Sequence, residues 1–195
     1  MTEKELYQSL DYVNHSREKR AEMALLVTTN PQLVRPLLKI AFEVDNPISN
    51  KACWVLEFTA KENLPFLYPH LDVFTANLGR VHFDSAVRPL AKICEFLTKT
   101  YFSKQKNELQ AIMTETQLER LTAACFDWLI GEHKVAAKAY SMTSLWLLGQ
   151  RYPWVHPELK MILEQNYPEG SAAYQARARE ILAKLKKLSA QKTSY

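Results

Sequence analysis

The sequence predicts an all-α protein, an α-α solenoid of about four helix pairs preceded by a capping pair of helices. A short motif, an apolar residue followed four positions later by Ala, recurs at near-constant spacing, which is typical of a repeat architecture. Around each copy the apolar residues follow the period of an α-helix, and no segment alternates for long enough to predict a strand. The chain has 195 residues, of which 47% are hydrophobic, so it can bury a sizeable core.

Four copies of the motif mark the predicted second helices of the pairs. The copies begin about 40 residues apart, the length of a helix-pair repeat, and they are Ile48–Ala52, Val87–Ala91, Val135–Ala139 and Tyr174–Ala178. The small Ala in mid-stripe lets a neighbouring helix approach closely. Before each copy stands a residue that we expect to cap the helix: Asp45, Asp84, Glu132 and Ser171.

The first helices of the pairs are predicted in the segments before these starts. They cover residues 31–44, 64–78, 116–130 and 156–166, and prolines mark many of the junctions. Pro89 lies inside the second copy, where it removes a backbone N–H. We therefore expect Pro89 to bend that helix or to delay its start.

The remaining segments complete one domain over residues 1–195. Residues 1–29 are predicted to form the capping helices, and residues 98–116 a polar insertion that lengthens the interval between the second and third copies. The C-terminal tail has an apolar face that includes Leu185 and Leu188 and is otherwise basic. We expect it to be the last solenoid helix, frayed over residues 189–195; a helix lying on a membrane surface is the alternative.

The second copy resembles a known repeat. HEAT repeats carry Asp-x-x-Val-Arg-x-x-Ala at the head of the second helix of a pair, a pattern matched by Asp84, Val87, Arg88 and Ala91. The other copies have other residues at the Arg position: Ser49, Ala136 and Gln175. The resemblance to HEAT/armadillo-like proteins covers roughly residues 30–185 and implies a concave face that binds proteins or nucleic acids.

Three stretches show a second resemblance, to short bacterial chains that are often labelled adenylosuccinate lyase. They are KACWVLEFTAKENL, DSAVRPLAKICEF and KVAAKAYSM. That lyase is more than twice this length, and its Ser-rich loop ending in Met-Pro-x-Lys-x-Asn has no counterpart here. The nearest segment, residues 141–143, lies within a predicted core helix. We therefore interpret the label as a misnomer.

Motifs for catalysis or metal binding are missing from the sequence. The five histidines form no HExxH or HxH spacing, the three cysteines form no CxxC pair, and there is neither a Gly-rich phosphate loop nor a GxSxG motif. Cys53, Cys94 and Cys125 lie in apolar helical stretches and are interpreted as buried, reduced thiols. We expect no catalytic residue, no metal and no cofactor, and hence a non-enzymatic protein.

Charge is distributed unevenly along the chain. The net charge is +4, but the basic excess lies after residue 170 and the rest of the chain is nearly neutral. A nucleic-acid surface should be basic along its length, so this distribution argues against one. No apolar run approaches the ~20 residues of a membrane span, and the charged N-terminus lacks the apolar centre of a signal peptide. We expect a cytoplasmic protein.

The densest polar cluster is GRVHFDSAVRP, residues 79–89. There Arg80, His82, Asp84 and Arg88 crowd a helix start, and as a binding site they suit a phosphate or a carboxylate. The structural alternative is that Asp84 caps the helix and pairs with Arg88 four residues further on. We favour the structural alternative.

A basic residue recurs at one repeat position. Lys51, Lys138 and Arg177 are equivalent by alignment, and the second copy has Leu90 there. Such a row could bind an acidic segment or a phosphate backbone; the alternative is a solvated edge whose aliphatic stems cover the core. Trp54 lies off the apolar stripe of its helix, either as a binding anchor or buried against the next helix pair.

These patterns favour a scaffold or adaptor that binds a protein partner on the face formed by the second helices. The alternative is a nucleic-acid-binding protein related in fold to DNA glycosylases for alkylated bases, which the nearly neutral body disfavours. The sequence leaves open the identity of the partner, the oligomeric state, and whether the basic row lies on the concave face or at an edge.

Overall fold

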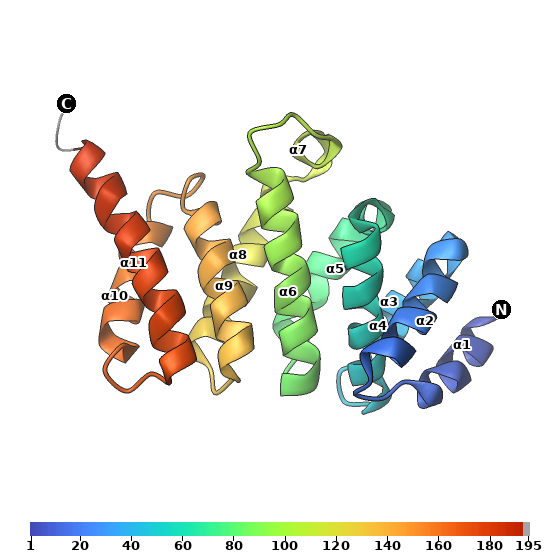
Figure 1. The fold of residues 1–195 in the computed structure, drawn as a ribbon. Coiled ribbons are helices and arrows are strands. Elements are labelled where there is room, and N and C mark those ends of the chain that lie inside the picture. Colours follow the sequence, from blue (N-terminus) through green and yellow to red (C-terminus); the bar gives the residue numbers. More distant parts are fainter. Residues whose placement is uncertain (193–195) are drawn as a thin grey trace.

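The computed structural model describes residues 1–192, and every regular element within them is a helix, which confirms the all-α prediction. One layer, at the front of Figure 1, consists of helices that contact one another in order: α2 (Arg17–Thr29), α4 (Ile48–Glu62), α6 (Asp84–Tyr101), α9 (Val135–Leu148) and α11 (Ala172–Lys192). A second layer lies behind it: α3 (Val34–Ala41), α5 (Leu71–Asn77), α8 (Glu115–Ile130) and α10 (Val155–Asn166).

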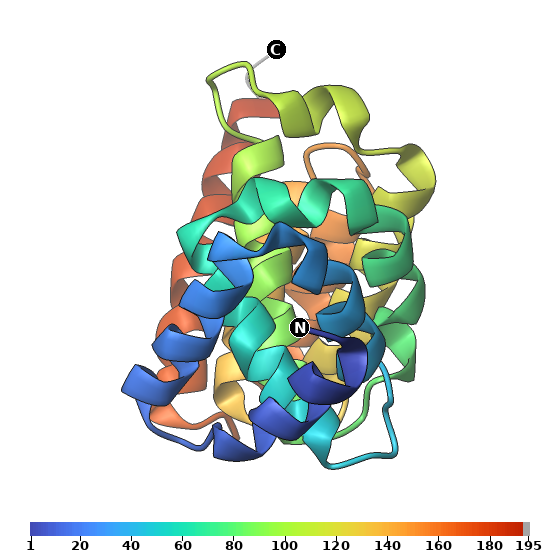
Figure 2. The same ribbon diagram turned by 90° about the vertical axis from the view of Figure 1, so that its right-hand side faces the viewer.

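The two layers alternate along the chain, so each helix of the back layer is followed by one of the front layer. This is the predicted α-α solenoid, with the second helix of every pair in the front layer. The front layer curves: in Figure 2 α6 is set back between α2 and α11, which stand further out. The face formed by the second helices is therefore the concave one.

One continuous cluster of buried hydrophobic side chains runs between the layers, from Leu6 to Leu185. Three of the four repeated alanines, Ala52, Ala91 and Ala178, are fully buried in it. Ala139 remains partly exposed, and its neighbour Ala137 takes the buried place in α9. The motif thus marks close packing between helices, as predicted, in three of its four copies.

Replacing Ala91 with Leu is expected to lower the free energy of unfolding by about 1–2 kcal/mol, because added methylene groups overpack a filled core. The same change at the partly exposed Ala139 is the matched control and should cost well under about 1 kcal/mol. Urea unfolding followed by circular dichroism measures both. Equal losses at the two positions would contradict the packing role assigned to Ala91.

The starts of α11 and α4 are two of the four places where a capping residue was predicted. Ser171 caps α11 as predicted, since its hydroxyl accepts the backbone N–H of Tyr174 at 3.3 Å. The prediction for Asp45 is wrong. α4 begins at Ile48, and it is the side chain of Asn46 that accepts the N–H of Ile48, at 3.2 Å.

Asp84 and Glu132 are not caps either. The cap positions are Phe83 for α6 and Lys134 for α9, and neither makes a side-chain capping bond. Asp84 is the first residue inside α6, where its carboxylate lies 2.8 Å from the ring nitrogen Nδ1 of His133. The capping prediction failed because a group from the next repeat binds this carboxylate, and that partner is invisible in the local sequence.

The first helices agree with prediction where prolines do not interrupt them. α8 and α10 lie within one residue of the predicted 116–130 and 156–166. Residues 31–44 instead hold a 3-10 turn, η2 (Pro31–Leu33), before α3, and residues 64–78 hold the longer η3 (Leu64–His70) before α5. Prolines in both turns lack the N–H that an α-helix would use, which favours the short 3-10 form.

The N-terminal segment and the insertion both contain helices, and the C-terminal helix extends beyond its predicted end. α1 (Glu3–Ser9), the 3-10 turn η1 (Leu10–Tyr12) and α2 form the N-terminal pair. Residues 98–116 include the end of α6 and α7 (Glu108–Ile112), and the buried Leu109 anchors this insertion on the core. α11 continues to Lys192, beyond the predicted fraying at residue 189, and residues 193–195 lie outside the described part.

Membrane association was the alternative for the tail. Within residues 1–192, no helix combines the length and the apolar character that a membrane crossing requires. The apolar residues of α11 face the rest of the solenoid, since Ile181 and Leu185 belong to the buried core.

Candidate interaction surface

The concave face carries a stripe of basic residues on α6, its central helix. Arg88, Lys92 and Lys99 recur at helical spacing, so they share one side of the helix, and all three are at least partly exposed. The other side of α6 packs into the core through fully buried residues: Val87, Leu90, Ala91, Cys94 and Leu97. Three cationic clusters, each built on one carboxylate, lie along this face.

Cluster 1 joins α2, α4 and α6. Arg88 donates two hydrogen bonds to Glu57, of 3.2 and 2.6 Å, and the carboxylate lies deeper, with 12% of its side chain exposed against 30% for Arg88. The guanidinium of Arg20 lies 4.5 Å from the ring centroid of Trp54. Burial, and then the positive charge of Arg88, lower the pKa of Arg20, so the two guanidinium groups are close enough to repel each other.

Cluster 2 lies on α6 alone. The side chain of Glu95 is only 2% exposed, and its carboxylate accepts from the ammonium groups of Lys92 at 2.6 Å and Lys99 at 2.8 Å. Burial raises the pKa of Glu95, but the two lysines outweigh it and the pKa falls below its ordinary value. The Lys92 ammonium also lies over the rings of Phe96, at 5.0 Å, and of Tyr140 on α9, at 4.4 Å.

Cluster 3 lies on α11. Glu180 accepts from Lys184 at 2.7 Å and pairs with Arg177 at 3.8 Å, and Arg177 also donates to the hydroxyl of Thr143 on α9 at 3.0 Å. The hydrogen bond from Lys184 lowers the pKa of Glu180, with smaller contributions from the charges of Arg177 and Lys99. Because Lys99 belongs to cluster 2, the two clusters are electrostatic neighbours across α9.

Clusters 2 and 3 therefore place two cations on one carboxylate, whereas in cluster 1 Glu57 binds Arg88 alone and Arg20 rests on Trp54. In clusters 1 and 2 the carboxylate is deeper than its cations and holds them at the surface. A lysine has three N–H donors and an arginine five, so each cation keeps donors for a further acceptor. The arrangement offers fixed cations with a small net positive charge, a chemistry that suits acidic groups on a bound molecule.

The 79–89 cluster is divided between the two faces of the molecule. Arg88 belongs to cluster 1, and the predicted pair between Asp84 and Arg88 is wrong, since Arg88 binds Glu57 and Asp84 binds His133. Arg80 instead donates to Asn77 at 2.7 Å and lines a groove of 800 Å³ beside α3 and α5. His82 lies 3.8 Å from the exposed carboxylate of Asp45.

The basic row predicted from the repeat is interrupted. Arg177 belongs to cluster 3, but Lys51 is held 3.0 Å from the backbone oxygen and 3.3 Å from the carboxylate of Asp11 in the N-terminal pair. Leu90, between them, is fully buried. Lys138 lines a separate hollow of 410 Å³ with residues at the start of α11. These positions do not form one ladder, because each side chain has different neighbours: Lys51 contacts Asp11, Lys138 lines the hollow beside α11, and Arg177 contacts Thr143.

Trp54 has a structural partner that explains its position. Its side chain is packed between α2 and α6 and the residue is 9% exposed. Its indole N–H donates to the backbone carbonyl of Ser85 at 2.7 Å. That carbonyl would accept from residue 89 in a regular helix, but Pro89 has no N–H to donate. Trp54 thus satisfies the acceptor that Pro89 frees, and α6 continues through Pro89 without a delayed start.

Sequence reasoning missed most of clusters 2 and 3, although a local signal exists. Lys92-x-x-Glu95-x-x-x-Lys99 and Arg177-x-x-Glu180-x-x-x-Lys184 share the same spacing of cation, acid and cation. Residues three and four apart are neighbours on a helix, so this pattern alone predicts the clusters. Arg20 gives no such signal, since its neighbours Trp54 and Arg88 come from other helices.

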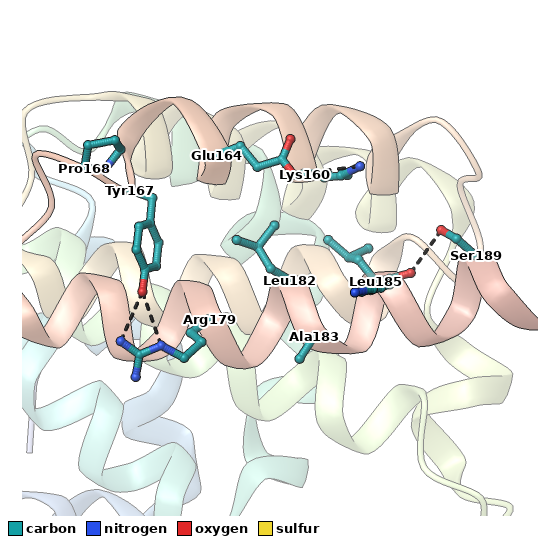
Figure 3. Close-up of a pocket in the computed structure, with 10 residues that line it drawn as sticks. Lys160, Glu164, Tyr167, Pro168, Arg179, Leu182, Ala183, Leu185 and Ser189 are labelled. Atoms are coloured by element: carbon teal, nitrogen blue, oxygen red, sulfur yellow. Dashed lines mark hydrogen bonds and ion pairs between the residues drawn. The ribbon is translucent and has the colours of Figure 1, made fainter.

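The open C-terminal end carries a further hollow, of 680 Å³, between α10 and α11 (Figure 3). Leu182 and Leu185 lie along it, and Arg179 donates to the hydroxyl of Tyr167 at one end, at 3.0 and 3.2 Å. Its walls belong to α10 and α11, the last helix pair of the described residues.

This architecture agrees with a known family of repeat proteins. A model of the HEAT repeat domain matches residues 7–185. The chain belongs to the HEAT repeat family. The match begins within α1, so the HEAT repeat region includes the N-terminal helix pair as well as the four copies of the motif. In the same comparisons, no curated protein and no solved structure matches the chain.

The cysteines of this HEAT repeat protein lie in its core. Cys53, Cys94 and Cys125 are free and buried, which confirms the interpretation from sequence. Burial raises the pKa of the Cys53 thiol well above its usual range. Among the residues that the structure describes, no three His, Cys, Asp or Glu side chains gather in a way that could hold a metal ion.

Proposed function

We propose that this HEAT repeat protein is a scaffold that binds a protein partner on its concave face. The observation that carries the proposal is the set of three cationic clusters along α2, α6 and α11. Five of their six basic side chains are held by three carboxylates, and the sixth, Arg20, lies against the ring of Trp54. Groups fixed in this way lose little conformational freedom on binding, which favours a specific contact.

A protein partner accounts for this face better than a nucleic acid does. The carboxylate in each cluster cancels part of the positive charge, and the excess that remains is small for a surface that must neutralise a nucleic-acid backbone. Aromatic rings lie among the cations: Phe96 and Tyr140 flank Lys92. A surface that mixes aromatic rings with arginine is typical of protein interfaces.

Neutralising Lys99 and Lys184 together, as Lys99→Gln with Lys184→Gln, is expected to reduce capture of the partner at least about tenfold, because each loses a charge-assisted contact. Both side chains are well exposed, and Lys92 still pairs with Glu95 when Lys99 is replaced, so the melting temperature should fall only slightly. The measurement is affinity capture from nuclease-treated lysate of the source cell, with quantitative mass spectrometry of the recovered proteins.

The matched control removes two lysines from the back layer, as Lys39→Gln with Lys160→Gln. These two lysines lie on α3 and α10 and are also exposed. The control therefore changes the net charge by the same amount but leaves the concave face intact. One protein recovered stoichiometrically, lost with the first pair and kept with the control, supports the proposal. Equal recovery with both pairs excludes the concave face, and recovery that requires nucleic acid in the lysate favours the nucleic-acid alternative instead.

A further inference from the structure

A small hollow of 170 Å³ lies at the start of α6, at one end of cluster 1. Four of its lining side chains are basic: His15, Arg20, Arg88 and Lys134. They come from four different parts of the chain, the N-terminal loop, α2, α6 and the residue before α9, so only the folded solenoid brings them together. The hollow is smaller than the roughly 300 Å³ at which small-molecule sites begin, and its size suits one side chain.

The positive charge of the hollow is not balanced from within the molecule. Arg88 is held by Glu57, and the one carboxylate in the lining, Asp84, lies 2.8 Å from His133. Arg20 donates through Nε to the backbone oxygen of Asn14 at 3.1 Å. Within residues 1–192, neither Arg20 nor Lys134 has a carboxylate partner. Glu57 offsets part of the charge of Arg20, and Asp84 adds one negative charge to the lining, but the three cations Arg20, Arg88 and Lys134 outnumber these two carboxylates.

This arrangement costs free energy in the unbound protein. Arg20 lies against the ring of Trp54, 4.5 Å from the centroid, and is only partly exposed, so water screens its charge incompletely. Burial and the charge of Arg88 both lower its pKa, which reports the same strain. An anion in the hollow would relieve the repulsion between the two guanidinium groups and accept their free N–H donors.

The backbone adds a second attraction for an anion. The hollow includes Ser85 in the first turn of α6, a helix of 18 residues. Phe83 at the cap position provides no side-chain capping bond, so free backbone N–H groups and the positive end of the helix dipole remain at this place.

We propose that this hollow binds a carboxylate side chain of an acidic segment in the partner protein, with Arg20 and Lys134 as the residues that contact it. The inference rests on the proposed function and identifies the chemistry of the partner. Lys92 follows Arg88 after about one turn of α6, so a segment anchored in the hollow would run on toward clusters 2 and 3. Further acidic residues in the segment would meet the cations there.

The test uses a short fluorescein-labelled oligoglutamate peptide, titrated with the full-length chain at low salt and followed by fluorescence anisotropy. The peptide is expected to bind, and Arg20→Gln should weaken binding roughly tenfold by removing a charge-assisted contact. Lys134→Gln should weaken it several-fold without affecting folding, because Lys134 is exposed and makes no ion pair in residues 1–192. The matched control is Arg35→Gln on α3 in the back layer, which should bind like the wild type.

Three outcomes of this test would overturn the inference. If Arg20→Gln and Lys134→Gln both bind the peptide like the wild type, the hollow takes no carboxylate. If inorganic phosphate binds in an Arg20-dependent manner and the peptide does not, the hollow is a phosphate site. If a short DNA duplex binds more tightly than the peptide and also requires Arg20, the ligand is a nucleic acid.

The inference and the proposed function fail separately. If the chain captures a partner through Lys99 and Lys184 but the peptide does not bind, the inference that the hollow binds a carboxylate is wrong and the proposed scaffold function stands. If the peptide binds through Arg20 and no partner is recovered, the hollow stands as a carboxylate site and the scaffold function is wrong.

Discussion

Replacing Trp54 with Phe is expected to lower the free energy of unfolding by about 3 kcal/mol, from a smaller buried ring and from a lost hydrogen bond. The ring packs between α2 and α6, and its N–H reaches the carbonyl of Ser85 at 2.7 Å. Phe fills part of the space but has no donor. The carbonyl that Pro89 frees then loses its protein partner beside the partly buried ring, a loss of about 1–2 kcal/mol.

Pro89→Ala separates the two contributions. Ala restores the N–H that completes the helix, so the carbonyl of Ser85 no longer depends on Trp54. In the Pro89→Ala background, Trp54→Phe should cost about 1–2 kcal/mol less than in the wild type. Urea unfolding of the four proteins, followed by circular dichroism, gives this coupling energy. Strictly additive losses would show that Trp54 acts through packing alone.

Glu95→Gln is expected to lower the free energy of unfolding by about 2–3 kcal/mol at neutral pH. Glu95 is 2% exposed and binds both Lys92 and Lys99. Gln has nearly the same shape but no charge, so two ammonium groups would repel each other over a neutral amide. The matched control is Glu180→Gln in cluster 3, which has the same spacing of cations but is half exposed, and a much smaller loss is expected there.

The pH dependence of the free energy of unfolding gives an independent measurement of the ion pairs that Glu95 forms with Lys92 and Lys99. The pKa of Glu95 is lowered in the folded protein, so its charged form stabilises the fold above the pKa of the unfolded chain, about 4.3. That stabilisation is lost as pH falls through the folded pKa. The difference in stability between wild type and Glu95→Gln should therefore be largest near neutral pH and shrink in acid. A difference that is constant down to about pH 3 would contradict the ion-pair account.

These predictions link stability to the binding face. Trp54 supports the ring surface on which Arg20 rests, and Glu95 holds two of the cations that we expect a partner to contact. A concave face built in this way uses residues that are themselves part of the packing. Substitutions at the exposed Lys99, Lys184 and Lys134 are therefore the ones that test binding with the least disturbance of the fold.

The sequence by itself was enough for the fold class and for the order of the helix pairs. Helical periodicity and the recurring Ala are local properties, repeated along the chain, and each copy reports the same packing requirement. Helix ends were less predictable, since Asp45, Asp84 and Glu132 had the right side chains but not the right partners. Ser171 was predicted correctly because its capping bond, to Tyr174, is local.

Only the tertiary structure decided how the polar residues combine. Lys51, Lys138 and Arg177 are equivalent by alignment, but each has different neighbours, which come from other helices. Clusters 2 and 3 could be predicted, since each lies within one helix. Cluster 1, the bond between Trp54 and Ser85, and the hollow with Arg20 and Lys134 join residues from separate repeats. The spacing of side chains within one helix follows directly from the sequence. Contacts between helices depend instead on the angle and the rotation at which the helices pack, and no local sequence pattern specifies these.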